Sequence, residues 1–347
     1  TNPTSKNFQP RIGFSYDPFG SGTTAIRGAF GMFDVLPLPY EFGLNTAATS
    51  PYQIIGKDKN ALLGTGTADP NVSFDPTQVR NRYVQQNPKR ALVMNWNVNV
   101  ERQFGSWTAF AGYVGSRSTH LSVAADDINL VQPVSTPYGL LWPVNGTAID
   151  PNWAGGTGGS GIRPVLFDGS ASYEAGQFQL RKTMSYGLEG QMSYTFGKCR
   201  DTSSAPVTGD TFATSIAVPI LLSKSYRVGA CDFDVRHNLS GNFMWEIPTP
   251  KSNGLKGAIT NGWQLGTIIT ALSGSPFTPT IGGGGDPLRT GYNGDFSMDF
   301  ANLVPNCNPI HGGANYLNTN CFALPSVPLS ALTTAPFLAA GGCYIAD

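Results

Sequence analysis

Residues 92–104 read LVMNWNVNVERQF, and this stretch decides the fold class of the 347-residue chain. Alternate positions are apolar, at Met94, Trp96, Val98 and Val100, and the positions between them hold Asn95, Asn97, Asn99, Glu101 and Gln103. Successive side chains of a β-strand point to opposite faces, so a strand here has one apolar face and one polar face. A helix, with a period of about 3.6 residues, would mix the two sets. The stretch therefore predicts a strand between an apolar environment and water.

Seven further segments carry the same two-residue period. We expect strands near 9–17, 23–33, 92–104, 107–116, 173–183, 187–197, 236–247 and 262–272. The last of these is the weakest, because Ile268 and Leu272 occupy the parity that is polar elsewhere. Aromatic residues lie near several strand ends, where the interfacial girdles of a membrane barrel would sit.

The connections between these segments are alternately short and long. The expected long surface loops are 34–91, 117–172, 198–235 and 273–347. A compact soluble domain rarely contains one such loop. Four of them, all leaving one end of the sheet, are typical of outer-membrane barrels with short periplasmic turns and long extracellular loops. We therefore expect an all-β fold, an antiparallel transmembrane β-barrel portion of about eight strands forming a single unit over 1–347.

The polar parity is built from small residues, which bears on the size of the barrel. Gly13, Ser15, Ser193 and Ser240 are too small to fill the interior of a narrow eight-stranded barrel. They suit one wall of a wide barrel instead. The chain also opens on Thr1 and has no signal peptide, so we interpret it as a fragment of a larger barrel protein.

Composition excludes several classes of function. The net charge is zero and charged residues make up 13% of the chain, which gives no basic surface for a nucleic acid. No run approaches the roughly 18 apolar residues of a membrane helix. An outer-membrane location, in contact with membrane lipid and lipopolysaccharide, is the expectation.

The chain has five cysteines, at Cys199, Cys231, Cys307, Cys321 and Cys343, all at strand ends or in expected loops. An oxidising cell surface favours disulfides over metal binding. Cys199 follows one strand and Cys231 precedes the next, so we predict a bridge between them. Cys307 and Cys321 form the second predicted pair, which leaves Cys343 without a partner. Five reduced cysteines are the alternative.

Catalytic and metal-binding motifs are sparse, and we expect no enzyme activity, cofactor or metal. His120, His237 and His311 are separate in the sequence. The block 232–237 (DFDVRH) could suggest a triad or a calcium site, but it lacks the calcium loop of about 12 residues and fits charged residues at the rim better. The GxGxxG match in 156–161 lies inside a long loop and not between a strand and a helix.

The candidate binding residues are polar side chains on the wet parity and aromatic side chains in a loop. The candidate lumen-facing residues are Glu101, Gln103, Gln179, Arg181, Glu189, Gln191 and Asn242. These residues either line a substrate path or simply face water. In the second long loop, Tyr138, Trp142 and Trp153 are candidates to stack on a ligand such as a sugar.

Six blocks carry a family resemblance. They are 7–20 (NFQPRIGFSYDPFG), 24–34 (TAIRGAFGMFD), 112–121 (GYVGSRSTHL), 177–201 (QFQLRKTMSYGLEGQMSYTFGKCRD), 232–248 (DFDVRHNLSGNFMWEIP) and 262–278 (GWQLGTIITALSGSPFT). Together they resemble the later barrel strands of TonB-dependent receptors, most closely the Oar-like group. The resemblance implies a barrel of about 22 strands that binds an extracellular ligand. It also implies import energised by the TonB complex through a plug domain, which is absent from this chain.

Other functions fit the same loops. A cell-surface adhesion or structural protein is the first alternative, and a passive porin is the second. A soluble β-sandwich is the least favoured.

Overall fold

A computed structural model describes residues 7–36, 81–124, 162–204, 227–249, 252–276, 299–310 and 316–323. It also describes short segments that contain β3 (Gly56–Lys57), β4 (Ser73–Phe74), β8 (Val134–Thr136), β9 (Gly139–Trp142), β15 (Thr280–Ile281) and β19 (Cys343–Ile345). The structural statements below refer to these residues.

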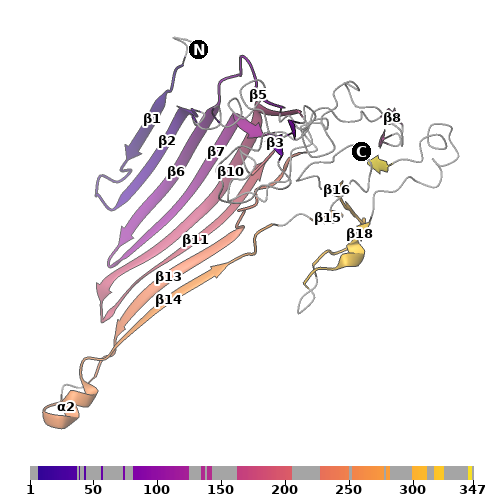
Figure 1. Cartoon of the computed structure of the whole chain (residues 1–347). Helices are drawn as coiled ribbons and strands as arrows, with labels where there is room; N and C mark the ends of the chain where they lie inside the picture. The colour runs from indigo at the N-terminus through magenta and orange to yellow at the C-terminus, as the bar shows by residue number, and fades with distance from the viewer. Residues whose placement is uncertain are drawn as a thin grey trace, which may run out of the picture.

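Eight long strands form one antiparallel sheet in chain order (Figure 1). They are β1 (Arg11–Tyr16), β2 (Thr24–Asp34), β6 (Leu92–Phe104), β7 (Trp107–Ala124), β10 (Ile162–Ser185), β11 (Leu188–Asp201), β13 (His237–Glu246) and β14 (Gln264–Leu272). Two short strands complete the ten-stranded sheet: β5 (Asn81–Val84) pairs with β10, and β12 (Gly229–Ala230) pairs with β11. The sheet is not closed, because β1 and β14 each pair on one side only among the described residues.

The remaining elements are small. Strand β16 (Asp299–Phe300) pairs with β15, and β17 (Asn302–Leu303) pairs with β18 (Phe322–Ala323), which follows the 3₁₀ turn η2 (Thr319–Cys321). Strand β9 pairs with both β8 and β19. No helix in the described part of the chain is long and apolar enough to cross a membrane.

All eight predicted strands are present, but β7, β10 and β11 are longer than predicted. They extend into the segments 117–172 and 198–235, which were expected to be loops. In the extension, β10 pairs with both β7 and β5. Val123, Pro164, Val165 and Phe167 are buried there. Because neighbouring positions are buried together, the sequence loses its alternation, and the two-residue period could not reveal these extensions.

The short connections are tight turns, as predicted. Tyr186 and Gly187 both have positive φ values, of 53° and 74°, as a two-residue type I′ turn requires. Gly105 has φ 59° in the turn before β7. In the first turn, the carboxylate of Asp17 accepts hydrogen bonds from the backbone amides of Gly22, Phe19 and Gly20. These amides, that of Gly22 foremost, hold the pKa of Asp17 below its usual value.

The fourth short connection, between β13 and β14, contains an element that the sequence did not predict. It contains the helix α2 (Gly254–Thr260), which lies beyond the sheet at the end of the short turns (Figure 1). The indole Nε1 of Trp263 donates to the carbonyl of Ile259 at 2.6 Å and ties the helix to the start of β14.

Strand register sorts the side chains of all eight strands onto two faces. One cross-strand row is apolar on every strand, and it consists of Tyr16, Ile26, Val100, Ala111, Phe178, Tyr194, Leu239 and Ala271. The neighbouring row, on the opposite face, consists of Ser15, Arg27, Asn99, Gly112, Gln177, Thr195, Asn238 and Leu272. The predicted apolar and polar parities are therefore two continuous faces of one sheet.

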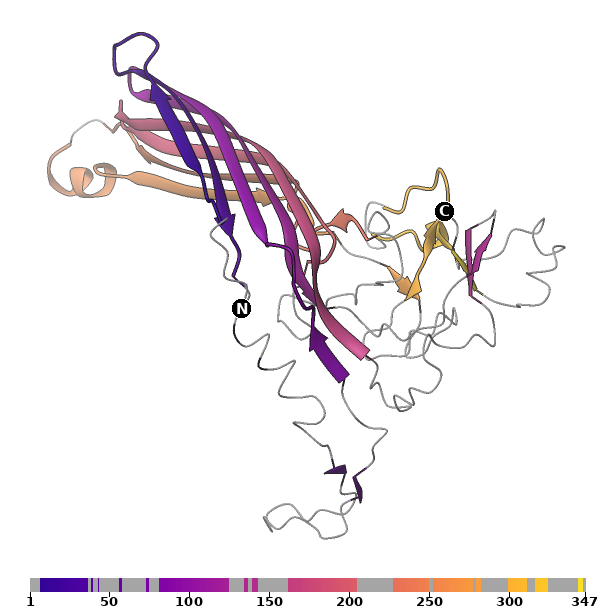
Figure 2. The same ribbon diagram turned by 90° about the horizontal axis from the view of Figure 1, so that it is seen from above.

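On β10, in the middle of the sheet, the two faces differ in exposure as the two sides of a curved wall do. On β10, Phe178 and Leu180 of the apolar face are 54% and 42% exposed, whereas Gln177 and Gln179 are half-buried. Side chains converge on the inside of a bend and spread apart on its outside. Figure 2 shows the strands as a bent sheet, and the exposures on β10 indicate that the polar face is the inner one.

The apolar face has the height of a membrane-crossing band. On β10, Glu174 and Lys182 bound an apolar stretch on this face that contains Gly176, Phe178 and Leu180. The segment from one charged residue to the other matches the roughly 9–11 residues that a tilted strand needs to cross a bilayer.

Aromatic rings on this face cover glycines of neighbouring strands. Gly115 on β7 is buried opposite Trp96 on β6, and a Cβ at Gly115 would lie 2.3 Å from Trp96 Cε2. A ring lies in the same way over Gly28, where Phe14 Cε1 would be 2.4 Å from an added Cβ. Each ring is held flat against the sheet only because the opposite residue has no side chain.

We predict that Gly115→Ala lowers stability, because the methyl group must displace the ring of Trp96. Overpacking of this kind costs about 1–3 kcal/mol. The measurement is the midpoint of denaturant unfolding, followed by tryptophan fluorescence of the protein in detergent. Gly176→Ala is the matched control on the same face, since the atom nearest to a Cβ at this position is Phe178 Cε2, at 3.6 Å. Equal losses in the two variants would contradict the prediction.

Candidate functional site

All seven residues predicted to face a lumen lie on the polar face and within three consecutive cross-strand rows. The first row contains Glu101 and Gln179, the second contains Gln103, Arg181, Gln191 and Asn242, and the third contains Glu189. These rows lie toward the end of the sheet where the short turns are. The structure therefore brings together side chains that are up to 141 positions apart in the sequence (242 − 101).

Four of these residues surround one hollow of about 540 Å³, namely Arg181, Glu189, Gln191 and Asn242. Met244 and Ile268 add apolar surface, and Ile268 is 85% exposed. Carboxamide groups both donate and accept hydrogen bonds, while a guanidinium only donates. The hollow therefore offers both hydrogen-bonding functions and an apolar contact to a molecule on the inner face.

Glu101 has a charged partner that the sequence interpretation missed. Its carboxylate lies 2.8 Å from the guanidinium of Arg27 on β2. Both side chains are nearly half exposed, so the pair contributes little to stability, about 0–1 kcal/mol. Arg27 lies on the parity opposite to Ile26, Phe30 and Met32, which places it on the polar face but does not identify Glu101 as its partner.

The other polar side chains of the site have weak contacts. Gln179 Nε2 lies 3.4 Å from Ser193 Oγ, and Gln103 Nε2 lies 3.5 Å from the carbonyl of Gly105. These long hydrogen bonds hold the amides only loosely. Both side chains can turn toward a solute on the inner face.

The predicted bridge between Cys199 and Cys231 is present at the opposite end of the sheet, with a Cα–Cα distance of 5.4 Å. The amide of Cys199 donates to Asp234 Oδ1 at 2.7 Å, and Asp234 also pairs with Arg236 at 3.2 Å. Nδ1 of His237 lies 2.8 Å from the hydroxyl of Tyr194. The block 232–237 is therefore a hydrogen-bonded rim, as interpreted from the sequence.

The rim also contains the carboxylate of Asp232. Burial raises the pKa of Asp232, whose amide donates to Ser204 Oγ at 2.9 Å. Within the described residues, no group of three or more histidine, cysteine or acidic side chains could hold a metal ion.

The second predicted bridge, between Cys307 and Cys321, is also present, with a Cα–Cα distance of 5.4 Å. Cys343 lies in β19, where its backbone pairs with that of Trp142 in β9. The side chains of these two residues are not described. Tyr138, Trp153, His311 and the glycine motif at 156–161 lie outside the described residues.

We predict that the double variant Cys199→Ser/Cys231→Ser weakens the sheet at its rim. The bridge closes a separation of 32 residues, and loops of this size contribute about 3–4 kcal/mol through the unfolded chain. The measurement is the denaturant midpoint of the protein in detergent. Cys307→Ser/Cys321→Ser, outside the main sheet, should leave the midpoint unchanged. Equal midpoints for wild type and the first variant would contradict the prediction.

Solved structures that resemble this chain include two transporters. The FrpB iron transporter from Neisseria meningitidis (F3-3 variant) is 12% identical, with a TM-score of 0.37 over 70% of this chain and 25% of that chain. The outer membrane transporter YddB from Escherichia coli is 11% identical, with a TM-score of 0.42 over 76% of this chain and 33% of that chain. The chain therefore spans about a quarter to a third of the length of these transporters.

No curated protein matches the sequence. The sequence does match a protein-family model described as the outer membrane beta barrel domain, over residues 1–340. The match extends over nearly all of the chain, so this protein belongs to the outer membrane β-barrel domain family and resides in the bacterial outer membrane.

Proposed function

We propose that this chain forms part of the wall of an outer-membrane receptor and transporter of the TonB-dependent kind, in the Oar-like group. Its extracellular loops bind a ligand, and its polar face forms part of the import channel. The TonB complex energises transport through a plug domain that lies outside this chain. The mechanism is binding and gating and involves no bond chemistry.

One observation carries the proposal: the polar face is continuous over eight strands, and small, amide-bearing and charged side chains make up most of it. Such a face leaves room for a solute and offers it hydrogen bonds. Lumen-facing positions of outer-membrane barrels set selectivity in this way. The resemblance of the strand blocks to TonB-dependent receptors supports energised import over passive diffusion.

The residues of the outer face support the proposal that lipids are partners of this protein. Above the apolar band, Arg117, Lys198 and Arg200 are exposed on this face, at the end that carries the long loops. Basic side chains at this height suit the phosphates of lipopolysaccharide. Below them, membrane lipid covers the apolar side chains.

We predict that cysteines at neighbouring positions of β10 will report the two faces. Gln179→Cys on the polar face should react with a charged maleimide in lipid vesicles, and Leu180→Cys on the apolar face should react at least about tenfold more slowly, because hydrocarbon suppresses the thiolate. Cys343→Ser supplies a background without this thiol. Equal rates at the two positions would refute the assignment of the faces.

We further predict that the protein purified from its outer membrane shows no steady conductance in planar bilayers bathed in potassium chloride. Urea at a concentration that unfolds a plug but spares the barrel should then open it, because the polar wall is already a water-filled path. Steady conductance before urea would identify a passive porin. The absence of conductance after urea would favour an adhesion or structural protein.

A further inference from the structure

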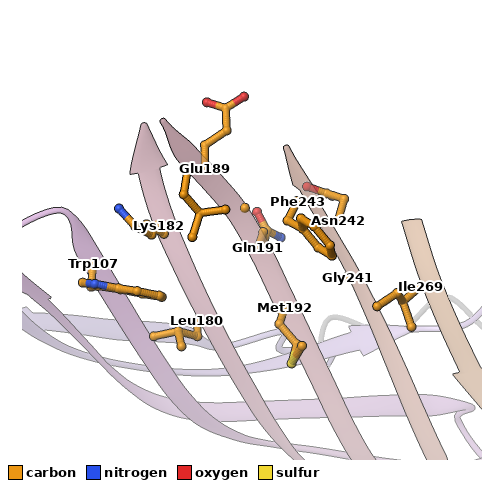
Figure 3. Close-up of a pocket in the computed structure, with 12 residues that line it drawn as sticks. Trp107, Leu180, Lys182, Glu189, Gln191, Met192, Gly241, Asn242, Phe243 and Ile269 are labelled. Atoms are coloured by element: carbon orange, nitrogen blue, oxygen red, sulfur yellow. The ribbon is translucent and has the colours of Figure 1, made fainter. Parts of the chain in front are cut away.

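The outer, apolar face carries a hollow of about 380 Å³ on β10, β11, β13 and β14 (Figure 3). Its walls are the side chains of Leu180, Met192, Phe243 and Ile269. Its floor contains Gly190 and Gly241, which add no side chain to the face. A slender apolar molecule would contact all four walls and the backbone between them.

A second hollow, of about 540 Å³, adjoins the first on the same face. The two share Leu180 and Met192, which stand between them as a ridge. The second hollow extends over Ala109 and Ala111 toward Arg102. Two adjacent apolar hollows on either side of one ridge match a ligand with two hydrocarbon chains.

A cationic polar cluster lies at the short-turn end of the first hollow. Lys182 Nζ donates to the carbonyl of Ser185 at 3.2 Å and to the hydroxyls of Ser185 and Ser106. It also lies 5.5 Å from the ring centre of Trp107. Figure 3 shows Lys182 and Trp107 together at one side of the hollow.

The charge of Lys182 is not neutralised within the part of the chain that the structure describes. Its contacts are hydroxyls, a carbonyl and an indole ring, and no carboxylate pairs with it. The nearest acidic residue in sequence, Glu189, belongs to the opposite face by register, and its carboxylate points away in Figure 3. The cluster therefore suits an anionic group that accepts hydrogen bonds.

From this geometry we infer a binding site for a glycerophospholipid of the periplasmic leaflet. Its two acyl chains lie in the two hollows, and its phosphate reaches Lys182 with the hydroxyls of Ser106 and Ser185. Lys182 lies close to the turn Tyr186–Gly187, and the short turns mark the periplasmic side. Phosphates of lipopolysaccharide would instead meet the basic residues at the far end of the band.

This lipid site requires only that the apolar face is in contact with lipid, and it does not require that the protein transports a solute. A protein that fails the conductance test can still hold this lipid, and a transporter can lack it. The inference and the proposed function therefore fail separately.

The test is native mass spectrometry of the protein purified from outer membranes, titrated in detergent with dioleoylphosphatidylglycerol. We expect wild type to retain one lipid, and Lys182→Gln to weaken retention about fivefold, which is the worth of one basic residue near an anionic lipid. Lys182→Arg should retain the lipid. Ala111→Leu, which narrows the second hollow without changing charge, should also weaken retention.

Arg181→Gln is the matched control, because it removes the same charge from the adjacent residue on the opposite face. It should not change lipid retention. A gel shift on heating verifies that each variant is folded. Retention by folded Lys182→Gln equal to wild type, an equal loss in Arg181→Gln, or equally tight binding of lipopolysaccharide at this site would overturn the inference.

Discussion

The pairing of backbone polar groups is the constraint on which the whole structure depends. A bilayer offers no water, so each backbone amide and carbonyl at membrane depth must find its partner inside the protein. Here neighbouring long strands meet this requirement with continuous antiparallel ladders, from β1 to β14. The two outermost strands remain half-paired among the described residues, and each presents an edge that a further strand can satisfy.

The ladder also explains why the two faces are so distinct. Once the register is set, a shift of one residue in any strand would place its apolar side chains in the interior. Tyr16 and Ala271 lie at opposite ends of one apolar row through eight strands, so no strand has slipped. Hydrophobic burial in lipid and hydration of the interior therefore reinforce the same register.

Much of this arrangement could be predicted because lipid on one face and water on the other select alternate residues along each strand. The pattern of residues 92–104 specified β6 and the face of each side chain, and the positions of Cys199 and Cys231 beside strand ends specified their bridge. Contacts between side chains of strands that are far apart in the sequence produce no such local pattern. Arg27 and Glu101 are 74 positions apart, so no local period in the sequence predicts that they pair.

The sequence pattern was also silent where both faces of a strand are buried. Pro164 and Val165 are neighbouring residues of β10 and both are buried, and Val165 pairs with β5 on one side and with β7 on the other. Alternation disappears under these conditions, although the strand continues. The helix α2 was not predicted for a different reason: its seven residues are too few to display a helical period.

The glycines of the outer face show how one residue type produces two kinds of surface. Gly115 lies beneath the ring of Trp96, so the lipid meets a smooth aromatic surface there. At Gly190 and Gly241, the nearest atoms to an added Cβ are backbone oxygens of the paired strands, those of Asn242 and Gln191. Phe243 lies opposite Gly190, but its ring atoms are not among the three nearest to an added Cβ, and both glycines line the hollow of about 380 Å³. The same missing side chain therefore gives close packing where the opposite ring lies over the glycine and a hollow where it does not. Composition alone cannot distinguish these outcomes, because they depend on the register that brings each glycine beside its neighbour.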